Sequence, residues 1–290
     1  MKIAILGAQG FLGKSLSSAL LNLGHEVIGF VLEPSKVANS NFPCRLVNEL
    51  ISTSQSNNFE FDVTINLAAR RSTLSQPLSE LQVTEYTFHI PREFIHKTAS
   101  QNTLVINAST YIQNYAGIKG KTVDSYGQAK QLLSNFIEDR SKVMGFRALD
   151  LYFFTLYGIG DRPSHLVPLL LTAARTGQEI ELSPGDQLLN LMYVEDAVSN
   201  ILKCLAWKME SPYEAYSVWA EDYFSVRQLV SRIESTINRD IKSKWGARSY
   251  AGHEMMKPWN VPVPQLPILS VPTTLEEGIK KIWQSSASIA

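Results

Sequence analysis

The sequence predicts an α/β fold: a doubly wound parallel sheet followed by a smaller, mainly helical lobe. Two observations lead to this prediction. Short apolar runs alternate with helical patterns over the first 160 residues, and a glycine-rich turn follows the first apolar run. Strands that alternate with helices form parallel βαβ units, and ligands bind such sheets at the carboxyl ends of the strands.

The elements of the first half follow from apolar patterning. Five apolar runs are short enough for buried strands, and three longer stretches repeat apolar residues with helical spacing. The strands are expected within residues 2–7, 25–32, 62–69, 102–109 and 147–158, and the helices within 14–24, 77–99 and 126–140. We predict one domain over residues 1–160.

In the second half, helical patterns predominate over strand patterns. Helical patterns occupy residues 165–177, 193–207, 224–237 and 273–283. The last pattern begins with Thr-x-x-Glu, which suits a capping box, and a proline-rich extended loop precedes it. We predict a smaller lobe over residues 161–290, with strand exchange between the two parts possible.

Composition excludes several classes of function. The 27 basic residues balance the 27 acidic ones, so no overall field favours nucleic acid. The two cysteines, Cys44 and Cys204, have no metal-ligand spacing, and we expect no metal. No apolar run approaches the length of about 20 residues that a membrane span needs. We expect a cytoplasmic protein without a membrane partner.

The glycine turn predicts a dinucleotide site. Gly7, Gly10 and Gly13 lie between the first strand and the first helix, where a pyrophosphate can contact free backbone N–H groups. The first glycine permits a sharp turn, the second lets phosphate approach, and the third lets helix and sheet pack closely. The first domain is therefore predicted to be a dinucleotide-binding domain of the Rossmann type.

Two Tyr-x-x-x-Lys pairs lie close together in the sequence. Tyr126 and Lys130 begin a helical pattern, so their side chains would project from one face. Tyr115 and Lys119 bracket a short segment that ends at Gly120, which favours a loop. We therefore choose Tyr126 and Lys130 as the chemical pair.

Several motifs together resemble one family. They are "LGAQGFLG", "FDVTINLAA", "NAST", "SYGQAK", "LYGIGD" and "GDQLLNLMYVEDA". The chain is similar to the extended short-chain dehydrogenase/reductase superfamily, the NAD-dependent epimerase/dehydratase family. It looks most like its nucleotide-linked deoxyhexose and dideoxyhexose synthases, which are 4-ketoreductases.

The resemblance implies roles for four catalytic residues. Tyr126 would donate a proton to a ketone oxygen, and Lys130 would hold the nicotinamide ribose and stabilise phenolate. A hydroxyl from Thr110, or from Ser109 before it, would bond the reacting oxygen. A tyrosine with an ordinary pKa of about 10 needs such nearby positive charge to act near neutrality.

The resemblance also implies the cofactor contacts. These would come from Gly7, Gln9, Gly10, Phe11, Leu12, Gly13, Asn48, Leu67, Ala68, Ala69, Tyr126, Lys130 and Phe153. NAD-specific members end the second strand with an acidic residue, but Val31 stands there and Glu33 lies two residues beyond. An arginine typical of NADP users near Leu32 is also absent. We slightly favour NADP(H) over NAD(H), with Lys14 as a possible phosphate contact.

Departures from the family's motifs exclude one of its reactions and alter its substrate contacts. Dehydratases carry Asp-Glu after the catalytic threonine, whereas Tyr111 and Ile112 stand here and cannot serve as acid and base. The family's substrate-clamping Arg-Asp pair is replaced by Leu189 and Asn190. Substrate contacts are expected from Thr110, Thr155 and Arg248. Thr155 stands where the family has an asparagine, and Tyr152 stands where the family has an arginine. Arg248 is our first choice for the diphosphate, and the other candidates are Arg71, Arg162 and Arg175.

Three functions stay open. The leading one is reduction of the C4 ketone of a nucleotide-linked 4-keto-6-deoxyhexose by NAD(P)H. A nucleotide-sugar 4-epimerase with tightly bound NAD is the alternative, since it would use the same tyrosine. A dinucleotide-binding module without turnover is the second alternative. The resemblance also makes a homodimer possible.

Overall fold

The computed structural model describes residues 1–53, 60–73, 76–220, 222–252, 254–267 and 271–287. The chain divides into two compact units. The first consists of residues 1–153, 198–218 and 261–268, and the second of residues 154–197, 219–260 and 269–290. The first unit therefore takes two segments from the later part of the chain.

A seven-stranded parallel sheet organises the first unit. Its strand order is β11-β6-β5-β4-β1-β2-β3, and every neighbouring pair is parallel. The strands are β1 (Lys2–Leu6), β2 (Glu26–Val31), β3 (Cys44–Leu46), β4 (Val63–Asn66), β5 (Leu104–Thr110), β6 (Arg147–Phe153) and β11 (Tyr213–Val218). The prediction of a doubly wound parallel sheet is confirmed, although β3 and β11 were not among the predicted strands.

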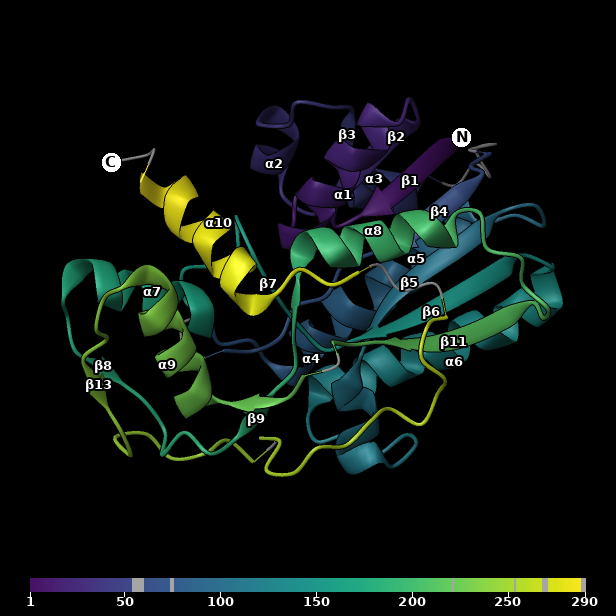
Figure 1. Ribbon diagram of the computed structural model, residues 1–290. Coiled ribbons are helices and arrows are strands. Elements are labelled where there is room, and N and C mark those ends of the chain that lie inside the picture. The colour runs from purple at the N-terminus through teal and green to yellow at the C-terminus, as the bar shows by residue number, and fades with distance from the viewer. Residues whose placement is uncertain (54–59, 74–75, 221, 253, 268–270, 288–290) are drawn as a thin grey trace. The chain divides into compact units, whose positions relative to one another are not determined.

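Helices cover both faces of this sheet. Figure 1 shows α1 in front of the strands, with α5 and α6 behind them. The helical segments are α1 (Phe11–Asn22), α2 (Pro34–Ala38), α3 (Val47–Ser52), α4 (Glu80–Thr84), the π-helical turn η1 (Glu85–His89), α5 (Ile90–Thr98), the 3₁₀ segment η2 (Tyr111–Gly117) and α6 (Ser125–Met144). The helix predicted within 77–99 is thus divided into three parts. Pro91, near the start of α5, has no N–H to donate to the preceding turn, and the π-helical turn η1 lies directly before α5.

Apolar side chains fill the space between sheet and helices. Phe30 of β2 packs against Phe94 of α5 with ring centroids 5.2 Å apart, and against Phe61 at 6.4 Å. All three rings are buried. Burying each large apolar side chain stabilises the fold by about 1.5–3 kcal/mol, so these contacts hold α5 against the strands.

The second unit is built from helices and short strand pairs. Its helices are α7 (Leu166–Thr176), α9 (Val226–Ile237) and α10 (Leu275–Ala287), while α8 (Val194–Cys204) contributes residues to both units. Its strand pairs are β7 (Thr155–Tyr157) with β10 (Leu191–Tyr193), β9 (Leu188–Leu189) with β12 (Phe224–Ser225), and β8 (Ile180–Glu181) with β13 (Ser243–Lys244). Before α10, Thr274 and Glu277 form the predicted capping box, since each side chain accepts the other's backbone N–H.

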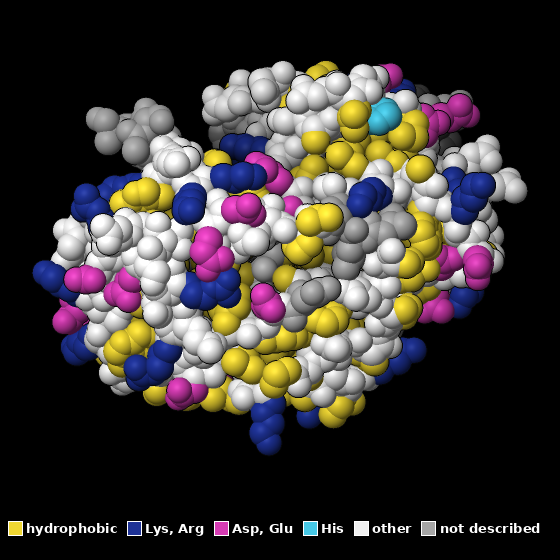
Figure 2. Space-filling model, in the orientation of Figure 1, with side chains coloured by type: hydrophobic (Ala, Val, Ile, Leu, Met, Phe, Trp, Pro, Cys, Tyr) yellow, Lys and Arg dark blue, Asp and Glu magenta, His cyan; other side chains and the backbone are white. Residues whose placement is uncertain are grey.

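Charged side chains are interspersed on the surface. On the face drawn in Figure 2, Lys and Arg side chains alternate with Asp and Glu side chains over each unit. Within the described ranges, every helix falls short of the length and apolar character that crossing a membrane requires. Those ranges also contain no group of three or more His, Cys, Asp or Glu side chains placed to hold a metal.

Candidate active site

The carboxyl ends of four neighbouring strands bring most predicted site residues to one edge of the sheet. Leu6 of β1 pairs with Asn66 of β4, and Asn66 pairs with Asn107 of β5. Thr110 at the end of β5 pairs with Phe153 at the end of β6. The glycine turn, residues 67–69, Thr110 and Phe153 therefore end or follow adjacent strands at the edge where such sheets bind ligands.

The glycine turn leaves room for a close approach of backbone and ligand. Gly7 has φ +85°, and a Cβ there would lie 3.0 Å from the Ala68 nitrogen. A Cβ on Gly13 would lie 2.1 Å from the Gly7 oxygen. Gly10 caps α1 with its backbone alone, because no side chain bonds the first N–H groups of this helix. These groups and the positive end of the helix dipole suit a pyrophosphate.

The remaining predicted cofactor residues surround this turn. Gln9 follows Gly7 and donates from Nε2 to Ser40 at 2.8 Å. Leu67, Ala68 and Ala69 follow β4 and are half-buried. Asn48 lies exposed in the first turn of α3, which directly follows β3. Phe11 and Leu12 lie in the first turn of α1.

Tyr126 and Lys130 lie one turn apart at the start of α6. Asp124 is the N-cap of this helix and accepts the Gly127 N–H at 2.8 Å. Lys130 is buried, and its ammonium donates to the Ala108 carbonyl at 2.6 Å. The helix thus brings the predicted proton donor and the predicted ribose ligand to the end of β5.

Two side chains act directly on Tyr126. The Thr110 side chain lowers the pKa of the Tyr126 phenol, and its hydroxyl accepts the backbone N–H of Gln113. The Arg71 guanidinium lies 5.8 Å from the Tyr126 ring, held by two hydrogen bonds to Asp124 of 2.7 and 3.1 Å. Arg71 was predicted only as a diphosphate candidate.

Burial opposes charge on both members of the Tyr-Lys pair. It raises the pKa of Tyr126 to about 12, with the nearby positive charge of Arg71 lowering that pKa in part. Burial lowers the pKa of Lys130 to about 8, and the negative charge of Asp150 acts in the opposite direction. Below about pH 8, Tyr126 therefore holds its proton and Lys130 is a cation, as proton donation to a ketone requires.

Ser109 faces away from this pair. Its hydroxyl donates to the buried Asp150 carboxylate and lies 3.1 Å from the Ser134 hydroxyl. Neighbouring strand residues point to opposite faces, so Ser109 and Thr110 cannot serve the same atom. The structure places Thr110 beside Tyr126. The Ser109 hydroxyl points instead toward Asp150 and Ser134, with which it forms a polar network.

The second Tyr-x-x-x-Lys pair does not form a helical face. Asn114, Tyr115 and Ala116 have non-helical dihedral angles within η2. The Tyr115 N–H donates to the Lys121 carbonyl instead of continuing a helix. This agrees with the loop predicted for Tyr115 and Lys119.

The predicted substrate residues Thr155 and Arg248 belong to the second unit. Thr155 is exposed at the start of β7, and Arg248 is exposed, with its backbone N–H donated to Leu182. Two other arginine candidates are engaged by neighbours. Arg175 stacks on the Trp283 ring at 4.4 Å, and Arg71 is paired with Asp124. Asn190, at the family's aspartate position, bonds the backbone of Ala220.

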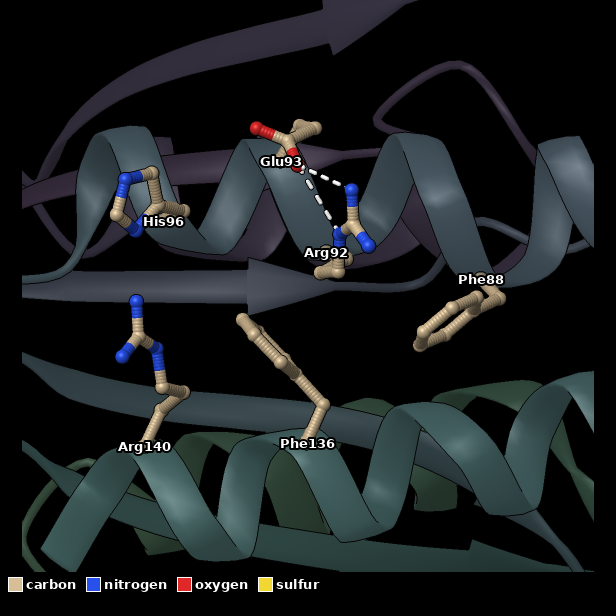
Figure 3. Close-up of a pocket in the computed structure, with 6 residues that line it drawn as sticks. All are labelled: Phe88, Arg92, Glu93, His96, Phe136 and Arg140. Carbon is tan, nitrogen blue, oxygen red and sulfur yellow. Dashed lines mark hydrogen bonds and ion pairs between the residues drawn. The ribbon is translucent and has the colours of Figure 1, made fainter. Parts of the chain in front are cut away.

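A separate pocket of about 350 Å³ lies between α5 and α6. Figure 3 shows the six residues that line it: Phe88, Arg92, Glu93, His96, Phe136 and Arg140. Arg92 donates twice to Glu93, and Arg140 lies 5.9 Å from the Phe136 ring. None of the predicted site residues lines this pocket.

Comparison with known proteins decides the family. The model of the NAD dependent epimerase/dehydratase family matches residues 3–218, well over half of the chain. The chain belongs to this family. NAD dependent epimerase/dehydratase proteins are enzymes that use a nicotinamide dinucleotide, which agrees with the glycine turn and the Tyr-Lys pair.

Individual relatives match most of the chain. It is 26% identical to CDP-abequose synthase of Yersinia pseudotuberculosis, over 89% of this chain and 92% of the relative. It is 22% identical to the protein CapI of Staphylococcus aureus, over 84% of this chain and 86% of the relative. Among solved structures, UDP-glucuronic acid 4-epimerase from Bacillus cereus, bound to UDP-glucuronic acid and NAD, covers both chains fully at 18% identity and a TM-score of 0.81. That likeness shows a shared fold.

Proposed function

We propose that this protein reduces the C4 ketone of a nucleotide-linked 4-keto-6-deoxyhexose. The observation that carries the proposal is the placement of Tyr126 and the buried Lys130 one turn apart on α6, against the end of β5 that carries Thr110. Tyr111 and the buried Ile112 supply no acid or base for dehydration. The similarity to CDP-abequose synthase supports a sugar-nucleotide substrate.

The chain's own residues would complete the reduction. Bound NAD(P)H supplies a hydride to C4. Tyr126 gives its phenolic proton to O4, so that the ketone becomes a hydroxyl group. Thr110 holds the reacting oxygen, Arg71 and Lys130 stabilise the phenolate, and solvent returns the proton to Tyr126.

Cofactor oxidation tests this function. Purified protein is mixed with NADPH, and separately NADH, and a CDP-linked 4-keto-6-deoxyglucose, and the loss of nicotinamide absorbance is followed. We expect oxidation that depends on the sugar and yields one hydroxyl per cofactor. If no cofactor is oxidised but NAD is released on denaturation, the reductase is wrong and the 4-epimerase takes its place.

We also propose a preference for NADP(H), from charges beyond the end of β2. Glu33 caps α2 and is paired with Arg70 and, at 3.5 Å, with Lys36. Two cations around one carboxylate leave positive charge available to a ribose 2′-phosphate. Arg70 also lies 4.7 Å from the Tyr86 ring, which holds its guanidinium near the residues that follow β4.

Replacing Arg70 by Gln is therefore expected to weaken NADPH binding about 10- to 150-fold and NADH binding little, since a charge-assisted contact contributes about 1.5–3 kcal/mol. Dissociation constants from cofactor fluorescence measure the change. Arg92→Gln is the matched control, because Arg92 also pairs with one carboxylate but lies on α5. An equal loss for both cofactors would contradict the role of Arg70, and tighter binding of NADH by the wild type would contradict the preference.

Three further expectations go with this function. Arg248, exposed and in no ion pair among the described residues, is proposed to hold the substrate diphosphate, with Thr155 as a second substrate contact. A homodimer is proposed through the helices flanking the site, on the family resemblance. A cytoplasmic location is proposed because Cys44 and Cys204 are free thiols.

A further inference from the structure

Three buried polar residues form a ladder across the middle of the sheet. Asn66, Asn107 and Asp150 stand in register on β4, β5 and β6, and none is exposed. The Ala68 N–H donates to Asn66, Asn66 donates to Asn107 at 2.8 Å, and Asn107 donates to Asp150 at 2.8 Å. Every step of this ladder runs from donor to acceptor toward Asp150.

The Asp150 carboxylate accepts each of the side-chain hydrogen bonds described for it and donates none of them. Asn107 and Ser109 donate to its Oδ1, and the Tyr213 hydroxyl of β11 donates to its Oδ2 at 3.0 Å. A carboxyl group surrounded by donors fits the ionised form, which only accepts. A buried carboxylate is costly unless a positive charge lies nearby.

Lys130 of α6 contacts the same stretch of β5 that carries this network. Ser109 bonds Ser134, which lies one helical turn after Lys130, and Lys130 bonds the carbonyl of Ala108 between Asn107 and Ser109. Lys130 is itself buried, and it forms no ion pair within 4 Å with any residue that the structure describes. The other titratable groups that interact with Asp150 are Tyr152 of β6 and Tyr213 of β11, and Glu138 of α6 interacts with both tyrosines. Tyr126 lies one turn before Lys130 on α6.

We propose that Asp150 is a positioning residue of the active site, whose buried carboxylate is the counter-charge of the Lys130 ammonium and fixes Ser109 beneath α6. The inference rests on the function proposed above only for its kinetic readout. Without the Asp150 charge, the desolvated Lys130 ammonium loses its proton at lower pH. Tyr126 then lacks the lysine cation one helical turn away.

Nuclear magnetic resonance of ¹³C-lysine-labelled protein tests the pairing without substrate. The Lys130 signal is assigned by its loss in Lys130→Met, and its titration is followed in the wild type, Asp150→Asn and Tyr213→Phe. Lys130 is expected to titrate near pH 8 in the wild type. The midpoint should fall by about one pH unit in Asp150→Asn. Tyr213→Phe removes one hydrogen bond to Asp150 but keeps its charge, so its midpoint should stay within a few tenths of a unit of the wild type.

The alkaline limb of kcat/KM should move with that titration, with Asp150→Asn losing about tenfold above the shifted limb. An unchanged Lys130 midpoint in a folded Asp150→Asn overturns the proposal, even where the enzyme is slower. If the wild type does not oxidise the cofactor, the proposed function is overturned. The pairing of Lys130 with Asp150 is then decided by the Lys130 titration, which needs no substrate.

The double variant Lys130→Met/Asp150→Asn covers the case in which Asp150→Asn does not fold. If the two charges compensate each other, removing both is less harmful than the sum of removing each. The double variant is expected to melt above Lys130→Met. A melting temperature equal to or below that of Lys130→Met would overturn the proposal, because removing the Asp150 charge would then relieve no uncompensated buried carboxylate.

Discussion

Tyr126→Phe is expected to lower kcat about 10²- to 10⁴-fold, because the variant keeps the ring but has no proton to give to the ketone oxygen. The Arg71 guanidinium lies 5.8 Å from the Tyr126 ring and its positive charge favours the phenolate, so the contribution of the phenol belongs to the transition state. KM for the sugar should change little, since the loss affects the chemical step and not ground-state binding. Initial rates of cofactor oxidation at several sugar concentrations separate the two constants.

The chain supplies its own control for this experiment. Tyr115 belongs to the other Tyr-x-x-x-Lys pair, in a segment without helical geometry. Tyr115→Phe should therefore keep kcat within about twofold of the wild type, as surface changes usually do. A large loss in Tyr115→Phe with little loss in Tyr126→Phe would show that the wrong pair had been chosen.

Much of the fold could be predicted because its signals are local. Glycines at 7, 10 and 13 mark a strand-turn-helix unit within a dozen residues, and the pattern after Tyr126 spans one continuous helix. The strand β11 gave no such signal. Tyr213–Val218 joins the sheet only by pairing with β6, more than sixty residues earlier in the chain, and no local pattern contains that register.

In the candidate site, too, features with a local sequence signal could be predicted, whereas contacts between distant segments could not. The choice of Tyr126 over Tyr115 depended on helix periodicity, which the sequence contains. The contact of Arg71 with Asp124 joins a loop to a helix cap 53 residues away, and could not be predicted from either segment. The separation of Ser109 from Thr110 follows from strand alternation, but the sequence alone did not say which of the two hydroxyls lies near Tyr126.

Gly13→Ala is expected to abolish measurable NADPH binding and to destabilise the fold by about 1–3 kcal/mol. A Cβ at this position would lie 2.1 Å from the Gly7 oxygen and 2.9 Å from two backbone atoms of Ala8. Backbone cannot rotate aside as a side chain can, so α1 must move away from the end of β1. That movement withdraws the free N–H groups of its first turn from the position where a pyrophosphate would lie.

Gly24→Ala at the other end of α1 is the matched control. Gly24 has φ +78°, which costs alanine roughly 1–2 kcal/mol, but its Cβ would meet no atom within 4 Å. Both variants should therefore melt below the wild type, whereas only Gly13→Ala should lose the cofactor. Thermal unfolding and NADPH fluorescence titration measure the two effects separately. If Gly13→Ala binds NADPH as tightly as Gly24→Ala, the close packing of α1 on the turn is not what forms the dinucleotide site.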